Sequence, residues 1–442
     1  MDSELTKESI GKLYGKYLIP SLGGALATSV YSFVDTIAVG QACGPDGAAA
    51  IAVINPYFAL MCFLGMLFGI GGSVLMSHAK GEGKPERADR LFTLSVLLLC
   101  ITIAISWILS AIFLDEILIF SGADDALLPY ARSYILPIVV SFPLFAINTF
   151  LAPVVRYDEK PQLVLKAVLI GGCFNIFGDW FLVFPMNLDM FGAGFATALG
   201  ALIQTAILLS HFVFRHSSLK FRKSRDAASD ARRILSTGFG ASILDVAIAV
   251  LTIIINKQTM KYGGRNELAV LGVIMTISFL LQHLYAGAGQ AVQPISSTNF
   301  GAGLRKRAWK SFTYLLWTSI AFGVLSTAVC ALFPEAILSL FMDTTESVMR
   351  IGPHIVIIYA LSFLLMAVNI NIVFFLQSVL LAFPALLFSL SRGIAVSGLL
   401  LFILPLFMSM DGILWAMVLA EVITFIVAMP YTLYARKKQL HS

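Results

Sequence analysis

The sequence has little charge. Of its 442 residues only 12% are Asp, Glu, Lys or Arg, whereas 58% are hydrophobic, and soluble domains carry roughly 25% charged residues. Water cannot solvate a surface of this composition, so a water-soluble globular protein and a disordered chain are both excluded. The formal net charge of +5 requires no nucleic acid as a partner, because the distribution of the basic residues along the chain explains it.

Motifs of metal, redox and hydrolytic chemistry are also missing. The five cysteines form no CxxC pair, so neither a metal site nor a disulfide framework is expected. The sequence has no GxxxxGK[ST], HExxH or GxSxG pattern and no long polar domain. We therefore predict no enzyme and no cofactor, and an ion gradient is the remaining energy source for a pump. No cleavable signal peptide is expected, because residues 1–16 mix acids and bases.

Long apolar runs are present instead. A membrane-spanning helix needs about 20 mostly apolar residues, and the sequence holds twelve such runs, which predict an all-α membrane protein. The predicted spans are 17–40, 51–78, 91–114, 131–154, 162–186, 191–214, 236–259, 268–298, 310–333, 353–377, 380–405 and 412–434. Only Gln377 and Ser378 separate the tenth run from the eleventh, so the direction of the last helices depends on a turn there.

Basic residues lie mainly on one side of these spans. If the N-terminus is cytoplasmic, the termini and the even-numbered connections hold 24 of the 30 Lys and Arg residues. The connections on the other side are richer in Asp and Glu, and Arg392 falls inside a span. The positive-inside rule then predicts a multi-pass protein of the plasma (inner) membrane with both termini in the cytoplasm.

The chain divides into two halves of six helices. The longest polar connection runs from Arg215 to Arg233, at the midpoint. Short glycine patterns recur about 220 residues apart, such as Met-Phe-Gly at 190–192 and Met-Asp-Gly at 410–412. Parallel repeats of this kind build transporters with a cavity between two bundles. The predicted parts are an N-terminal six-helix lobe (1–214), a cytoplasmic linker (215–235) and a C-terminal six-helix lobe (236–442).

Four carboxylates lie inside the predicted spans, namely Asp35, Asp179, Asp245 and Glu421. A carboxylate at bilayer depth costs about 2.5 kcal/mol or more, so each needs a partner, a proton or water. Asp35 lies near the end of its span and has the simple alternative of reaching the membrane interface. A functional role is nevertheless favoured for Asp35, and more strongly for Asp179.

Asp179 has support from its own helix. Asn175 lies four residues earlier and therefore on the same face. An amide oxygen and a carboxylate that point one way suit Na⁺, or a proton shared over hydrogen bonds. If the first and fifth spans pack together, Asp35 and Asp179 share one small volume, where two like charges hold one proton or one cation. A coupling-ion site needs this property.

The second half offers candidates for a substrate cavity. Asp245 and Glu421 each lie about nine residues into a span, where they would attract a cationic substrate or take a proton. A hydrogen bond to a neighbouring helix is the alternative, with even weight. Arg392 needs a partner or water, and Glu421 is the candidate. Further polar groups in the eighth span are His283, Gln290 and Gln293.

Several segments together resemble the MATE (multidrug and toxic compound extrusion) family over essentially the whole chain. These segments are Val34–Gly40, Gly71–Gly81, Asn175–Asp179 with Gly192–Thr197, and Gly289–Ile295 with Asn299–Ala302. The resemblance implies a V-shaped pair of six-helix lobes around a central cavity. It also implies a monomeric secondary antiporter that expels organic, lipophilic cationic compounds by alternating access in exchange for H⁺ or Na⁺.

The resemblance also assigns the ion site. The family's cation site in the N-terminal lobe maps onto Asp35, Asn175, Asp179 and Thr197, where Na⁺ or a proton would bind. The chain departs from the family where relatives often carry an Asn-rich stretch, because it has Leu-Ala-Pro at 151–153. Asn148, one turn earlier, is the candidate substitute.

Three other functions compete with this prediction. A flippase or exporter of a lipid-linked substrate shares the architecture, but it would need a cationic cavity, whereas four acids and one Arg lie in the spans. A membrane-embedded enzyme would need a clustered catalytic set. A channel would need a filter-like repeated loop. The sequence shows neither, so a cation-coupled efflux antiporter is the leading prediction.

Overall fold

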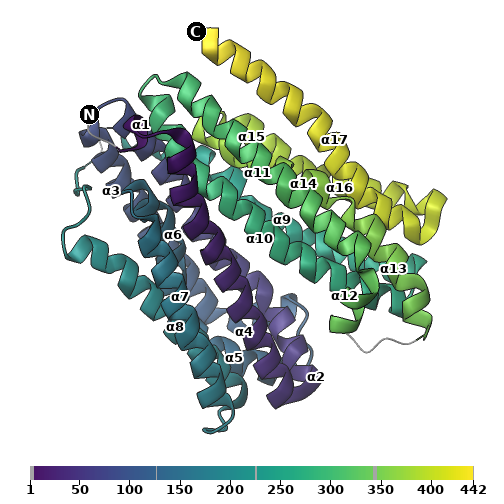
Figure 1. The fold of residues 1–442 in the computed structure, drawn as a ribbon. Helices are drawn as coiled ribbons and strands as arrows, with labels where there is room; N and C mark the ends of the chain where they lie inside the picture. Colours follow the sequence, from purple (N-terminus) through teal and green to yellow (C-terminus); the bar gives the residue numbers. More distant parts are fainter. Residues whose placement is uncertain (1–3, 126, 224–225, 342–345, 442) are drawn as a thin grey trace. The chain divides into compact units, whose positions relative to one another are not determined.

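The chain is almost entirely helical. The computed structural model describes residues 4–125, 127–223, 226–341 and 346–441, and these contain no β-strand. The elements as far as the midpoint are α1 (Glu4–Lys7), α2 (Ile10–Gly81), α3 (Pro85–Ile112), α4 (Leu114–Phe120), α5 (Leu128–Val140), α6 (Phe142–Tyr157), α7 (Pro161–Gly178), the π-helical turn η1 (Asp179–Val183) and α8 (Asp189–Val213) (Figure 1). The all-α prediction is confirmed.

The second half follows the same pattern of long helices. Its elements are α9 (Ala227–Tyr262), α10 (Arg265–Gly301), α11 (Arg305–Leu332), α12 (Pro334–Phe341), α13 (Glu346–Ala360), α14 (Phe363–Ser378), α15 (Ala382–Leu390), the π-helical turn η2 (Ser391–Ala395), α16 (Val396–Ile403) and α17 (Pro405–His441). Helices dominate because a spanning segment must satisfy its backbone hydrogen bonds internally.

The described helices agree with the predicted spans. Ten helical stretches are long and apolar enough to cross a membrane, and two bent helix pairs raise the number to twelve if each pair is one span. The bent pairs are Leu128–Val140 with Phe142–Tyr157, and Ala227–Ile243 with Val246–Tyr262. The break between the tenth and eleventh runs is also found, because α14 ends at Ser378 and Leu380 has a φ of 60°.

The chain forms two compact units. One comprises Ile19–Ser242, here the N-terminal unit, and the other comprises Met1–Leu18 with Ile243–Ser442, here the C-terminal unit. Residues before Ile19 join the C-terminal unit because Asn299 Nδ2 donates to the Leu5 carbonyl (2.9 Å) and Arg307 Nη2 to the Glu8 carbonyl (2.5 Å). The division into two six-helix lobes stays a prediction.

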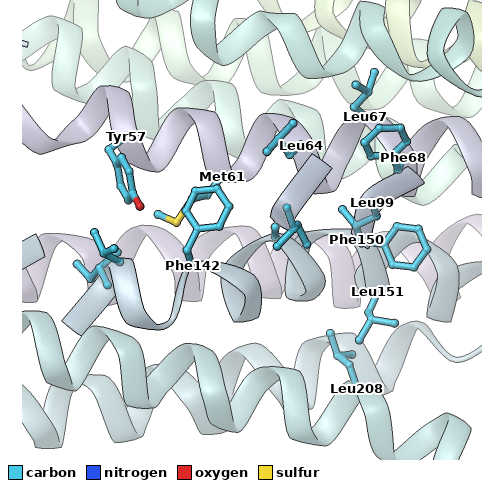
Figure 2. Packing of buried hydrophobic residues seen from close by; sticks show 14 of the residues in the cluster. Tyr57, Met61, Leu64, Leu67, Phe68, Leu99, Phe142, Phe150, Leu151 and Leu208 are labelled. Carbon is cyan, nitrogen blue, oxygen red and sulfur yellow. The ribbon is translucent and has the colours of Figure 1, made fainter. Parts of the chain in front are cut away.

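The core of the N-terminal unit follows from helical spacing. Tyr57, Met61, Leu64 and Phe68 of α2 recur every three or four residues, which places them on one face (Figure 2). This face meets α6, where the ring of Phe142 lies edge-on to Tyr57 with centroids 5.7 Å apart. Lipid tails are as apolar as these side chains, so close packing rather than escape from water stabilises such a contact.

Small residues let the backbones of α2 and α9 touch. A Cβ on Gly238 would lie 1.9 Å from the Leu67 carbonyl oxygen, and a Cβ on Gly71 would lie 2.2 Å from the Ile234 carbonyl oxygen. No side chain fits at either distance. The two glycines therefore determine how closely these helices approach, as small residues do in membrane helix pairs.

The backbone repeats at the offset seen in the sequence. Gly192 approaches the backbone of Leu182, and Gly412 approaches that of Leu404 in the same way, with Cβ distances of 3.0 and 2.5 Å. Left-handed backbone conformations also recur in pairs about 220 residues apart, at Gly44 and Gly264, Gly83 and Gly303, Glu159 and Leu380, and Asp189 and Ser409. The turns that join the helices are thus equivalent in the two halves.

The contact between α2 and α9 can be tested by replacing a glycine at the contact with alanine. We expect Gly238→Ala to lower the midpoint of thermal unfolding in detergent by several degrees, because overpacking costs about 1–3 kcal/mol. Gly24→Ala is the matched control, since a Cβ there meets nothing within 4 Å. It should leave the midpoint unchanged or raise it, because alanine favours a helix over glycine. Equal midpoints for the two variants would contradict this account.

Candidate functional site

The four residues predicted for the ion site lie together in the N-terminal unit. Asp35 comes from α2, Asn175 from α7, Asp179 from the start of η1 and Thr197 from α8. The carboxyl groups of Asp35 and Asp179 lie close enough to interact electrostatically. Asn175 Nδ2 donates to Thr197 Oγ1 over 3.2 Å. The first and fifth spans therefore do bring their acids into one volume.

Tyr134 of α5 is a fifth member that the sequence reasoning missed. Its hydroxyl donates to Asp35 Oδ2 over 2.7 Å and lies 3.5 Å from Thr197 Oγ1. The side chain is only 2% exposed. Tyr134 lies in an apolar run, and the only sequence signal was that a buried tyrosine hydroxyl usually finds a partner. Which partner it finds depends on the rotation of α5 against α2 and α8.

Small residues on α8 set this geometry. A Cβ on Gly194 would lie 2.0 Å from the Tyr134 carbonyl oxygen, so α8 approaches the backbone of α5 directly. On the neighbouring face, a Cβ on Gly178 would lie 2.8 Å from the Cβ of Ala196, so α8 also packs closely against α7. Thr197 lies one turn after Gly194 and directly after Ala196. It is therefore held beside both Tyr134 and Asn175.

Several oxygens of the cluster have no donor. Asp35 Oδ1, Asn175 Oδ1 and both carboxylate oxygens of Asp179 are buried without a hydrogen-bond partner among the described residues. Asp179 is fully buried and Asp35 is 7% exposed. A buried carboxylate without a basic partner needs a proton or a cation. The oxygen donors present fit either a shared proton or a small hard cation such as Na⁺.

A second set of polar side chains continues from this cluster. Tyr31, one turn before Asp35 on α2, interacts with Gln204 of α8. Asn148 of α6 donates from Nδ2 to Gln204 Oε1 over 2.8 Å. The expected substitute Asn148 is therefore a partner of Gln204, which the sequence reasoning missed. In the described hydrogen bonds it does not reach Asp35 or Asp179.

Glu421, a buried carboxylate of the C-terminal unit, has a basic partner. Arg392, on η2, donates to Glu421 Oε1 from Nη2 (2.8 Å) and from Nε (3.1 Å), so the predicted partnership is confirmed. Asn369 of α14 donates to Glu421 Oε2 over 2.7 Å. Arg392 is 6% exposed and Glu421 is 4% exposed. The charge of Glu421 is thus neutralised by Arg392 inside the unit.

The other residues predicted for the substrate cavity are not joined to this pair by the described hydrogen bonds. His283, half-buried on α10, meets the Phe279 carbonyl of its own helix through Nδ1 at 2.9 Å. Gln293 is buried and donates to Gln377 Oε1 over 3.3 Å. Gln290 is half-buried on the same helix. Asp245 belongs to α9, but its side chain lies outside the described part of the structure. Their role in a cavity stays a prediction.

Known sequences and structures resemble this chain over nearly its whole length. The MatE family model matches residues 20–181 and 241–397. The multidrug export protein MepA of Staphylococcus haemolyticus is 22% identical over 436 residues, which are 98% of this chain and 95% of that protein. The probable multidrug resistance protein YoeA of Bacillus subtilis is 25% identical over 380 residues, which are 81% of this chain and 79% of that protein.

Solved structures support the fold. One described as the outward-facing conformation of a multidrug resistance MATE family transporter of the MOP superfamily superposes with a TM-score of 0.92, at 18% identity, over 99% of this chain and 98% of that one. A MOP superfamily transporter from Pyrococcus furiosus reaches a TM-score of 0.91 at the same identity and coverage. At such low identity these matches establish the fold alone.

The bond from Tyr134 can be tested by removing its hydroxyl. We expect Tyr134→Phe to lower the stability of the detergent-solubilised protein by about 1–3 kcal/mol, because a buried Asp35 oxygen loses its donor. Tyr130→Phe is the matched control, since Tyr130 lies one turn earlier on α5 and is 37% exposed. Thermal unfolding of both variants beside the wild type measures the difference. A Tyr134→Phe curve identical to the control would show that the hydroxyl is dispensable.

The buried ion pair predicts non-additive substitutions. Arg392→Gln should destabilise the protein by about 3–5 kcal/mol, because it leaves Glu421 buried without a cation. The double variant Arg392→Met with Glu421→Met should recover most of that loss, because neither charge remains. Arg132→Gln removes one partner of the exposed pair with Asp115 (3.4 Å) and should change little. If the effects of Arg392→Met and Glu421→Met, each measured alone, add up to that of the double variant in chemical unfolding, the pairing is contradicted.

Proposed function

Because this chain belongs to the MatE family, whose members are transporters and not enzymes, we propose that it is a secondary active antiporter that exports organic compounds in exchange for H⁺ or Na⁺ by alternating access. The chain is a multi-pass membrane protein. The observation that carries the coupling is the cluster of Asp35 and Asp179, whose orphaned buried oxygens need a proton or a cation. Relatives named as multidrug export and resistance proteins support drug-like substrates.

The cluster suggests how ion binding acts on the protein. A proton or Na⁺ arriving from outside would bind between Asp35 and Asp179, with Asn175 and Thr197 as further oxygen ligands. Tyr134 would keep the Asp35 carboxylate oriented toward this point, because its hydroxyl donates to one of the two oxygens. Relief of the repulsion between two carboxylates would favour the packing of α2 against η1 and α8. The position of the first span would thereby differ between the ion-bound and the ion-free protein.

The substrate would be an organic and lipophilic cation. We propose that Asp245, with the half-buried polar groups His283 and Gln290 and the buried Gln293, lines its cavity. Glu421 would act through Arg392, since the pair carries no net charge while the described bonds hold. Attraction of a cation to Glu421 would therefore require that Arg392 first move away.

The remaining features of the proposal follow from charge and family. The excess of Lys and Arg in the even-numbered connections supports an inner-membrane protein with both termini in the cytoplasm. Two six-helix lobes, 1–214 and 236–442, would move against each other around the linker 215–235. We propose that the monomer is the functional unit.

The decisive experiment is transport in proteoliposomes. We expect uptake of a fluorescent lipophilic cation to depend on an imposed pH or Na⁺ gradient, and the effective gradient identifies the ion. Asp35→Asn and Asp179→Asn should each abolish gradient-driven transport, because each removes one of the two charges that hold the ion. The matched control is Asp189→Asn, which makes the same change at an exposed residue of the same unit and should retain transport.

Each result discriminates between the proposals. Transport that persists in both variants would place coupling outside this cluster and contradict its role. Transport of no cation under either gradient would contradict the antiporter and favour export or flipping of a lipid-linked or other substrate on the same fold. Hydrolysis of ATP stimulated by substrate, or a single-channel conductance, would contradict secondary transport altogether.

A further inference from the structure

One end of the C-terminal unit is strongly basic. It is formed by the turn before α11 with its first turns, and by the last turns of α17, which lie together because Arg305 Nη1 donates to the Gln439 carbonyl over 2.8 Å (Figure 1). Segments 301–312 and 434–441 contain no Asp or Glu. Their basic residues are Arg305, Lys306, Arg307, Lys310, Arg436, Lys437 and Lys438.

An open, shallow cavity of about 480 Å³ lies at the start of α11, where it also meets Leu440 of α17. Its lining consists of Gly303, Leu304, Arg305, Lys306, Arg307 and Leu440. The surrounding residues are held in place, because Trp309 Nε1 donates to Gln439 Oε1 (3.1 Å) and Arg307 Nε donates to Asn299 Oδ1 (2.9 Å). The cavity thus combines a fixed framework with the exposed ammonium group of Lys306.

Among the described residues, the nearby acids already have basic partners. In the N-terminal segment of the same unit, Glu4 already pairs with Lys16 (2.5 Å) and Glu8 with Lys12 (2.7 Å). None of the ion pairs found among the described residues includes Lys306, Lys437 or Lys438. The three lysines are exposed and leave an excess of positive charge around the cavity.

The internal repeat shows that the fold does not require this excess. Gly83 and Gly303 have the same left-handed backbone, with φ of 74° and 75°, and each leads into the next long helix. Around Gly83, however, acids accompany the bases. Glu82 lies 3.0 Å from Lys84, and Glu86 pairs with Arg222 at 2.7 Å. Among the described residues, the turn at Gly303 and the helix that follows it therefore carry bases without acids, unlike the equivalent turn at Gly83.

Exposed apolar and aromatic side chains continue from the basic residues along both helices. On α11 the side chains of Tyr314 and Trp317 are 38% and 67% exposed. On α17 those of Leu433 and Tyr434 are 49% and 64% exposed. Tyrosine and tryptophan favour the level of the lipid headgroups in a membrane. Along both helices the side chains thus change from apolar through aromatic to basic toward this end. A phospholipid would match this order, with its acyl chains beside the apolar side chains and its phosphate beside the basic ones.

We propose that the cavity at the start of α11 binds the headgroup of an anionic phospholipid. The phosphate would lie in the cavity beside Arg305 and Lys306, with Lys437 and Lys438 around its opening. The acyl chains would run along Tyr314 and Trp317. Basic pockets at the ends of membrane helices recognise anionic headgroups in this way.

Lipid binding to the full-length protein tests the proposal. Purified protein in a neutral detergent is titrated with phosphatidylglycerol or with phosphatidylcholine, and bound lipid is counted by native mass spectrometry. We expect tighter binding of phosphatidylglycerol and a preference that falls as salt rises. The double variant Lys306→Gln with Lys437→Gln should weaken phosphatidylglycerol binding about 25-fold, at about fivefold per basic residue. Binding of phosphatidylcholine should not change.

Two further variants isolate the site. Lys306→Arg with Lys437→Arg keeps the charge and should retain the preference for phosphatidylglycerol. Lys257→Gln with Lys261→Gln removes the same charge at the end of α9, away from the cavity, and should also retain it. Equal binding of the two lipids by the wild type, or equal loss in the two glutamine double variants, would overturn the proposal. So would displacement of phosphatidylglycerol by millimolar inorganic phosphate, since that would assign the cavity to free phosphate.

Discussion

The structure depends on one constraint: a charged side chain inside a membrane-spanning helix must find a partner, a proton or water. The two units meet this constraint in opposite ways. In the C-terminal unit Arg392 and Asn369 bind Glu421, so its charge is compensated within the protein. In the N-terminal unit Asp35 and Asp179 face each other, and the only described hydrogen-bond donor to either is Tyr134. Among the described side chains, Glu421 thus has a basic partner, whereas Asp35 and Asp179 have none.

Close helix packing makes both arrangements possible. Glycines at positions such as Gly194 and Gly238 let one backbone touch another, with distances that exclude any side chain. In lipid such contacts supply much of the attraction between helices, because burying apolar side chains away from lipid gains little. They also fix the rotation of each helix. A polar atom such as the Tyr134 hydroxyl is therefore aimed at one partner and held there.

The two halves of the chain share their backbone turns but differ in the polar side chains attached to them. The backbone turns recur in both halves, down to the left-handed residues such as Gly83 and Gly303. The chemistry attached to them does not recur. Among the described residues, carboxylates without a basic partner occur in the first repeat at Asp35 and Asp179, while the Arg392–Glu421 pair and the cluster of bases on α11 and α17 occur in the second. Differences between equivalent positions of one chain thus point to binding, because the shared fold alone does not demand them.

The sequence by itself determined the helical class, the number of spans and the residues whose charge the membrane must accommodate, because hydropathy and charge are local properties of the chain. It also brought Asp35, Asn175, Asp179 and Thr197 into one site through a family resemblance. The sequence also proposed Glu421 as the partner of Arg392, and the structure confirms that pair. Only the tertiary structure added Tyr134 and Gln204 and grouped the residues before Ile19 with the C-terminal unit. These contacts cross between helices and depend on how far each helix is rotated about its axis. An almost uniformly apolar helix such as α14, buried on nearly all sides, carries no polar stripe that would encode that rotation.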